Sequence, residues 1–184
     1  MKHNYTNILL AAVLIFTAAA SRVIFSEAHF YNFAPIGALG LFSGAVIKDK
    51  KYAFLMPLLA QFAADLYFQF FTSIDGFYDI SQFFTYAGLA AATMLGFSMK
   101  QIKPVQLLGY TLGASSLFFL ISNFGVFVQG WHGTGFSALV TTYTLAIPFY
   151  KNTLIGDLAG SALLFGTYQL IGTYSLRQTA KARI

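Results

Sequence analysis

Two acidic residues, Asp65 and Asp157, lie inside apolar stretches of the sequence. Gln61 precedes Asp65 by four residues, so a helix would place both side chains on one face. A carboxylate in the middle of a membrane costs roughly 2.5–3.5 kcal/mol on insertion scales and usually faces a cavity or a partner, so each is a candidate for a ligand-binding or gating role. The alternative is structural, with Asp65 forming an ion pair with Arg22. Asp157 would correspondingly pair with Lys151.

Polar and aromatic side chains collect in three segments between apolar stretches, around residues 22–32, 73–82 and 129–152. The second of these contains Tyr78 and Gln82. Aromatic rings can stack on a planar ligand, while arginine, histidine and asparagine fix its polar edges. The structural alternative is that Tyr and Trp gather at any membrane interface. The candidate substrate-binding residues are Arg22, His29, Asn32, Gln61, Asp65, Asn123, Trp131, His132, Tyr143, Asn152 and Asp157.

The sequence contains none of the local motifs that identify common enzymes. His-Glu-x-x-His, Gly-x-Ser-x-Gly and a phosphate-binding loop are absent, and without cysteine there is no thiol nucleophile. His132 and Ser137 imitate a hydrolase pair, but no fitting motif surrounds them. The histidine and aspartate spacings match no known metal-ligand pattern. We therefore predict that the chain is not an enzyme and has no catalytic residue, no metal site and no cofactor.

The composition points to a membrane environment. Of the 184 residues, 57% are apolar and only 9% are charged, against roughly 25% charged in a soluble domain. This balance excludes a disordered chain and a nucleic-acid-binding module, and it disfavours an ordinary soluble enzyme. The absence of cysteine also excludes a disulfide framework and a thiolate metal site. The expected surroundings are therefore a lipid bilayer.

Six apolar stretches predict an all-α integral membrane protein, a six-transmembrane-helix bundle that forms one domain over residues 1–184. The spans are expected at about residues 8–25, 33–47, 53–71, 83–99, 105–128 and 153–174. The second is shorter than the ~20 residues that a span needs, so we expect it to pack inside the bundle after an irregular start at residues 32–35. Residues 136–147 are also short, which indicates a re-entrant or interfacial segment before the last helix. The alternative, a soluble helical core, needs polar helix faces that residues 107–128 lack.

The basic residues are distributed unequally between the two sides of this six-span arrangement. One side holds only Arg22 and Lys151. The other side holds Lys2, Lys48, Lys50, Lys51, Lys100, Lys103, Arg177, Lys181 and Arg183. Cytoplasmic segments carry an excess of Lys and Arg, so both termini are expected in the cytoplasm. Asp65, Asn123 and Asp157 would then form the floor of an outward-facing site roofed by the three outer connections.

The N-terminus also fits a second interpretation. Lys2, the apolar run 8–17 and the small residues 18–20 imitate a secretory signal with its cleavage site. Cleavage would leave five spans and an external N-terminus. Apolar residues continue through positions 23–25, which favours an uncleaved first span.

Small residues spaced by four positions indicate close helix contacts in lipid. Ordinary packing within the bundle is the first explanation, and docking of a partner membrane protein is the alternative. The spaced residues are Gly40 with Gly44, Gly88 with Ala92 and Gly96, Gly109 with Gly113, and Gly156 with Gly160.

Several segments resemble a family of small, uncharacterised bacterial integral membrane proteins that is related to the substrate-binding S components of energy-coupling factor (ECF) transporters. The resemblance extends from about residue 22 to about residue 175. The segments that carry it are Asn32–Leu39, Leu41–Gly44, Pro57-Leu58 with Asp65, Phe118-Phe119, Asn123–Val126, Ile147–Phe149, Asn152–Leu154 and Gly156-Asp157.

The resemblance implies a six-helix subunit of the bacterial inner membrane that captures a vitamin, a vitamin precursor or a metal ion from outside. Such a subunit docks on a membrane coupling subunit, and two cytoplasmic ATPases supply the energy. Many S components carry an Ala-x-x-x-Ala pattern in the first span for docking. The first span here has alanines but no such pair, which departs from the family pattern.

Three functions therefore follow from the sequence. The first is a membrane substrate-binding or transport subunit that captures a small solute at the outer face. The second is a non-catalytic scaffold or assembly subunit, which a fully packed outer face would favour. The third is a lipid-modifying membrane enzyme that uses Asp65 and Asp157 as a pair of carboxylates.

Overall fold

Helices account for most of the chain in the computed structural model, which describes residues 2–30 and 32–181. The side chains are described over residues 12–30 and 32–170, and no strand occurs among the described residues. The helices are α1 (Lys2–Glu27), α2 (Ile36–Val46), α3 (Lys50–Phe71), α4 (Asp79–Phe97), α5 (Pro104–Gln129) and α6 (Gly135–Lys181). The predicted all-helical class is confirmed.

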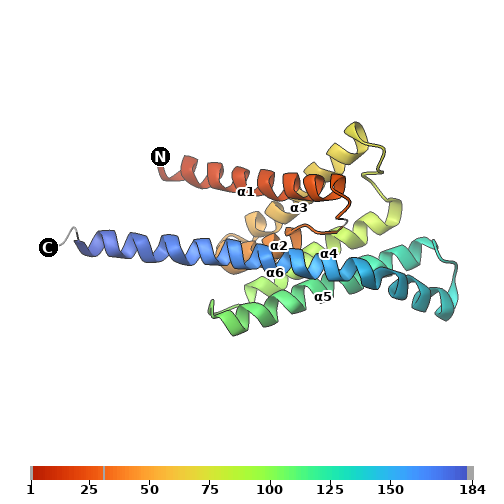
Figure 1. The fold of residues 1–184 in the computed structure, drawn as a ribbon. Coiled ribbons are helices and arrows are strands. Elements are labelled where there is room, and N and C mark those ends of the chain that lie inside the picture. The colour runs from red at the N-terminus through yellow and green to blue at the C-terminus, as the bar shows by residue number, and fades with distance from the viewer. Residues whose placement is uncertain (1, 31, 182–184) are drawn as a thin grey trace.

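Figure 1 shows that the two ends of the chain lie at the same end of the bundle, where the α4–α5 connection also lies. We call this the terminal end. The α3–α4 and α5–α6 connections lie at the opposite end, which we call the loop end. Helix α6 runs the length of the bundle and extends beyond it at the terminal end (Figure 1).

The short helix α2 occupies the centre of the bundle. It contacts all five other helices, and residues 36–44 of its 11 residues are buried. At 1.5 Å per residue it is about 16 Å long, which is too short to cross a membrane of about 30 Å. Asn32, with a φ of 61°, precedes it in an irregular segment. The expectation of a short interior helix with an irregular start is confirmed.

A hydroxyl of α2 compensates for a proline in α3. Pro57 has no N–H to bond the carbonyl of Ala53, four residues earlier. The Ser43 hydroxyl of α2 donates to that carbonyl at 2.8 Å and shares its proton with the carbonyl of Gly40 at 2.9 Å. All of these groups are buried, so the bond satisfies an acceptor that would otherwise have no donor.

Glycines allow the backbones of α2 and α4 to come into direct contact. A Cβ at Gly44 would overlap the carbonyl of Thr93, and one at Gly96 would overlap the carbonyl of Leu41. The small-residue contacts predicted for these two helices are therefore confirmed. The prediction is not met at Gly109, because a Cβ there would meet no atom of the described side chains or backbone within 4 Å.

The predicted re-entrant segment at residues 136–147 is wrong, because residues 135–181 form the single helix α6 with Pro148 inside it. The first part of α6 is held along α5 by side-chain bonds. The Tyr143 hydroxyl donates to the carbonyl of Leu120 at 2.7 Å, and the hydroxyls of Ser116 and Tyr150 lie 2.8 Å apart. These contacts keep the helix continuous where the sequence pattern indicated a break. With 47 residues, α6 is about 70 Å long.

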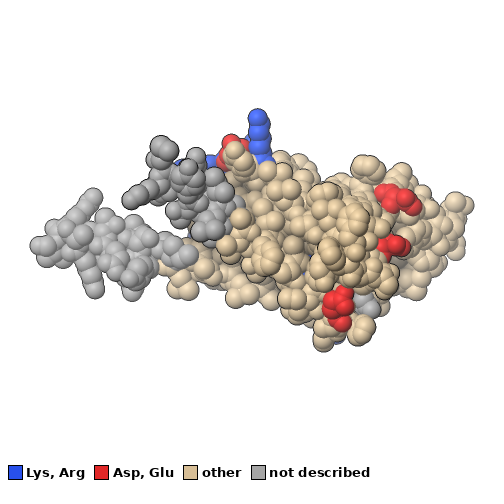
Figure 2. Space-filling view, turned by 90° about the horizontal axis from the view of Figure 1, so that it is seen from above, with Lys and Arg blue, Asp and Glu red and all other residues tan. Residues whose placement is uncertain are grey.

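The outer surface of the bundle is strongly apolar. Many large apolar side chains are exposed, including Phe16, Phe71, Phe83 and Leu163, each at least 70% exposed. Within the part of the chain that the structure describes, three helices, α3, α4 and α5, are long and apolar enough to cross a membrane. On the face shown in Figure 2, Lys and Arg side chains lie toward the terminal end, whereas most acidic surface lies toward the loop end. Exposed apolar area of this extent marks a surface that contacts lipid or another protein.

Candidate functional site

A cavity of about 330 Å³ lies near the loop end of the bundle. It is lined by parts of all six helices and by the α1–α2, α3–α4 and α5–α6 connections. Trp131 lines it and is 59% exposed, so the cavity reaches the surface. Five of the 11 predicted site residues line it, namely Arg22, Asn32, Gln61, Asn123 and Trp131.

A buried carboxylate lies behind the wall of this cavity. Asp65 is fully buried and forms an ion pair with Arg22, the alternative left open by the sequence. Gln61 also donates to one carboxylate oxygen at 3.0 Å. Gln82 and Tyr86 of α4 donate to the other oxygen at 2.6 and 3.1 Å. Four donors from three helices therefore surround Asp65, which joins α1, α3 and α4.

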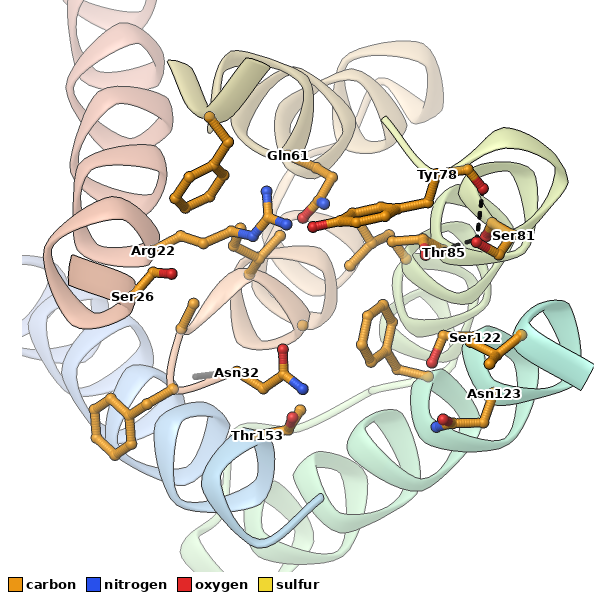
Figure 3. Close-up of a pocket in the computed structure, with 18 of the residues that line it drawn as sticks. Arg22, Ser26, Asn32, Gln61, Tyr78, Ser81, Thr85, Ser122, Asn123 and Thr153 are labelled. Atoms are coloured by element: carbon orange, nitrogen blue, oxygen red, sulfur yellow. Dashed lines mark hydrogen bonds between the residues drawn. The ribbon is translucent and has the colours of Figure 1, made fainter. Parts of the chain in front are cut away.

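Arg22 presents its guanidinium to the cavity while it holds Asp65. Its side chain is 21% exposed, and the guanidinium carbon lies 5.0 Å from the centre of the Phe68 ring. Figure 3 shows Arg22, Gln61 and Tyr78 pointing toward one another across the cavity. A guanidinium has five N–H donors, and Asp65 uses one of the Arg22 nitrogens, so donors remain for a ligand.

Helix α4 supplies a polar stripe to the cavity wall. Tyr78, Ser81 and Thr85 follow one another at helical spacing and line the cavity. Ser81 donates to the carbonyl of Tyr78 at 2.8 Å, and Thr85 donates to the carbonyl of Ser81 at 3.3 Å (Figure 3). Burial raises the pKa of the Tyr78 hydroxyl above its ordinary value of 10, and the positive charge of Arg22 partly offsets this rise. Tyr78 is therefore a neutral donor at physiological pH.

The α5–α6 connection is fastened to α4 through Gln129. In the amide orientation that satisfies its neighbours, Gln129 donates to the Tyr78 carbonyl at 3.0 Å and to the Ser81 hydroxyl at 2.8 Å. Its oxygen then accepts from the indole N–H of Trp131 at 3.0 Å. Helix α5 ends here, with Gly130 in the left-handed conformation at a φ of 81°. These bonds hold Trp131 at the cavity mouth.

Two asparagines present amide groups to the cavity from opposite walls. Asn32 points into it from the α1–α2 connection (Figure 3), and its side chain has no hydrogen-bond partner among the described residues. Asn123 of α5 donates its amide N–H to the carbonyl of Phe119 at 2.8 Å, which leaves its amide oxygen available. Both residues were among the sequence candidates, and their placement is compatible with contact to a ligand.

Asp157 does not line the cavity, although the sequence placed it on the floor of the site. One carboxylate oxygen accepts from the backbone N–H of Ala38 at 2.8 Å, and the other accepts from the Ser115 hydroxyl at 2.6 Å. Pro35, at the N-cap of α2, has no side chain able to cap, so Asp157 of α6 supplies the cap. The proposed pair with Lys151 does not form. Residues six apart on a helix lie on different faces, and Lys151 is exposed whereas Asp157 is buried.

Four further candidates lie outside the cavity lining. His29 has a φ of 62° and is exposed, and Asn152 is half-buried in α6. The His132 ring bonds the Thr142 hydroxyl at 3.1 Å, and the Tyr143 hydroxyl bonds the carbonyl of Leu120. The last two therefore stabilise the α5–α6 hairpin.

Sequence reasoning missed several residues of the site. The α5 residues Phe118, Ser122 and Val126 line the cavity at intervals of four, as Ser81, Thr85 and Leu89 do on α4. The signal that could have found these two series is their spacing of four, which places each series on one face of its helix. Tyr78 and Gln82 were recognised only as polar residues of a connection, because their orientation depends on where α4 begins.

The family assignment follows from the whole chain rather than from the site. A model of a family of unknown function (DUF6580) matches residues 2–180. The chain belongs to this family. It matches no curated protein and no solved structure. This membership agrees with the expected resemblance to an uncharacterised family. The description of the family does not link it to ECF S components.

The site therefore offers hydrogen bonding and ring contacts. Among the described residues, no group of three or more His, Cys, Asp or Glu side chains is placed to hold a metal ion. The two buried carboxylates are both occupied by donors of the protein itself. What remains for a ligand is a cavity with one guanidinium, several hydroxyls and amides, and the rings of Phe33, Phe68, Phe118 and Trp131.

Proposed function

We propose that this chain is a multi-pass membrane subunit that binds a small solute entering from the loop end. The observation that carries the proposal is the cavity of about 330 Å³, which has a mixed polar and aromatic lining. Small-molecule sites have volumes of about 300–1,000 Å³ and combine apolar walls with a few convergent polar groups. This cavity is at the lower end of that range and has that kind of lining.

The proposed orientation puts the loop end outside the cell and both termini in the cytoplasm of a bacterium. The exposed apolar side chains and the three span-capable helices support a membrane location. The predominance of Lys and Arg toward the terminal end supports the proposed cytoplasmic position of that end. The central α2 is then a half-length helix whose N-terminal residues 36 and 37 line the cavity from inside the membrane.

The proposed transport role follows the resemblance to ECF S components. In this role the chain captures the solute and docks on a membrane coupling subunit, and cytoplasmic ATPases drive reorientation of the bundle. The chain contains no phosphate-binding loop of its own, so the nucleotide would be used by the partner.

The other two functions receive less support from the geometry. A scaffold without a ligand needs no polar cavity, and an enzyme that uses Asp65 and Asp157 needs carboxylates that reach the substrate. Neither carboxylate lines the cavity.

The test is purification in mild detergent, followed by mass spectrometry of the released small molecules and of any co-purifying subunits. Wild-type protein should release one small solute. Asn123→Ala should lose it, because Asn123 contributes an amide to the cavity wall. Gln106→Ala is the matched control, since Gln106 is an exposed amide residue at the other end of the same helix and should retain the solute.

Two outcomes would contradict the proposal. One is a wild-type chain that binds no solute, either alone or with its co-purifying subunits. The other is a solute that Asn123→Ala and Gln106→Ala release in equal amounts.

A further inference from the structure

We infer that the cavity selects solutes without net charge, with a planar ring bearing a carbonyl, amide or hydroxyl group. This inference rests on the proposed function and concerns the class of its substrate.

Within the described part of the chain, the cavity wall carries a single charged side chain, and that charge is balanced. Arg22 is the one charged residue among the described residues that line the cavity. Its charge is balanced by Asp65, directly behind it. Arg22 and Asp65 together therefore contribute no net charge. A carboxylate ligand bound to the remaining Arg22 donors would bring a second negative charge beside Asp65 without a second cation, which is costly in a partly buried site.

The N-terminus of α2 is the second feature of the cavity that bears on the charge of a ligand. The start of a helix has unpaired N–H groups and a partial positive charge, which makes it attractive to anions. Ile36 and Gly37 of this helix start line the cavity. However, the N–H of Ala38 already bonds the carboxylate of Asp157. The helix start is therefore already paired with a carboxylate of the protein.

The remaining polar groups of the lining suit an uncharged ligand. The other polar side chains of the wall are neutral hydroxyls and amides, including Asn32, Gln61 and Asn123. The Tyr78 hydroxyl is neutral as well, because burial raises its pKa. Such groups, with the free N–H donors of Arg22, match the carbonyl and hydroxyl groups of an uncharged ligand.

The aromatic rings of the lining favour a planar ligand. Phe33, Phe68, Phe118 and Trp131 contribute ring surface to the wall, and aromatic rings pack favourably against another planar ring. A cation would find no unpaired carboxylate in the lining, because Asp65 and Asp157 lie behind it and accept bonds from the protein. An uncharged planar solute satisfies all four observations.

The experiment measures binding of matched probe triplets to the purified wild-type chain in lipid nanodiscs. Each triplet has one ring, phenyl, pyridine or indole, carrying an amide, a carboxylate or an aminomethyl group. For pyridine these are nicotinamide, nicotinate and 3-(aminomethyl)pyridine. We expect at least one amide to bind, and to bind at least about tenfold more tightly than its carboxylate and amine partners, because an unbalanced charge is costly in the cavity.

A variant reverses the expected preference. Asp65→Asn leaves Arg22 without its counter-charge, so within the same triplet the carboxylate should gain at least about tenfold over the amide. Asp49→Asn is the control, since Asp49 is an exposed helix cap at the terminal end, and asparagine caps helices as well as aspartate does. It should leave the preference unchanged.

Tighter binding of a carboxylate or an amine to the wild type would overturn the inference while leaving the proposed function intact. So would a solute of net charge among the molecules released by the purified protein. Failure of every probe to bind would also overturn it, and the solute-release experiment would then decide separately whether the proposed function survives. The wild-type panel decides the question even if Asp65→Asn does not fold.

Discussion

The two buried carboxylates of this protein have different partners and so different roles. Asp65 is paired with a cation that faces the cavity, so its charge affects what the cavity can bind. Asp157 bonds a backbone N–H and a hydroxyl deep in the bundle, where it joins α2, α5 and α6. A sequence contains the same residue type in both places. Only the neighbouring residues distinguish Asp65, beside the proposed ligand site, from Asp157, which caps a helix.

Asp157→Ala should destabilise the protein without changing the solute that it selects. The substitution leaves the N–H of Ala38 and the hydroxyl of Ser115 without their acceptor, and an unsatisfied buried polar group costs about 1–3 kcal/mol. Thermal unfolding in detergent measures the loss of stability, and the probe panel measures selectivity. Normal stability with lost binding would mean that Asp157 contacts the ligand directly.

At the level of whole helices, α2 and α3 depend on each other through one hydroxyl. Ser43→Ala should lower stability by about 1–3 kcal/mol, because the carbonyl of Ala53 loses its donor in a buried place. In a Pro57→Ala background the new N–H at position 57 can bond that carbonyl within α3, so the same substitution should cost clearly less.

A double-mutant cycle on Ser43 and Pro57 measures this coupling by the free energy of unfolding. Equal costs of Ser43→Ala in the two backgrounds would show that the hydroxyl does not act through the Ala53 carbonyl.

The helix arrangement could be predicted from the sequence where a segment's length and polarity decide its place. The short apolar run at residues 33–47 had to be interior, and the structure has α2 there. The start of α6 could not be predicted in this way. Pro148, Lys151 and Asn152 look like a break, but packing of Tyr143 and Tyr150 along α5 keeps the helix continuous.

The candidate site could be predicted where a single residue type was unusual in its part of the sequence. Arg22, Asn32, Gln61, Asn123 and Trp131 stood out as polar or aromatic residues at the edges of apolar stretches, and they line one cavity. The polar stripe of α4 did not stand out, because Ser and Thr are common in apolar helices. The role of Asp157 as a cap for a helix 119 residues earlier in the chain depends on tertiary structure alone.

At the scale of the whole molecule, the cavity and the termini are at opposite ends. Because solute entry from outside requires the loop end to face the exterior, the orientation of the chain is the most direct test of the proposed direction of binding. The chain contains no cysteine, so a single introduced cysteine reports its own location without background labelling.

Ser73→Cys in the α3–α4 connection and Ser98→Cys at the end of α4 are matched reporters, since both serines are exposed and they lie at opposite ends of α4. A membrane-impermeant thiol reagent added to intact cells, with the outer membrane permeabilised where one is present, should label Cys at position 73. It should label position 98 only after the inner membrane is opened. The positive residues Lys100 and Lys103 next to Ser98 are the physical reason, because segments rich in Lys and Arg are retained in the cytoplasm. Labelling of position 98 in intact cells would contradict the proposed orientation. The proposed solute would then enter the cavity from the cytoplasm.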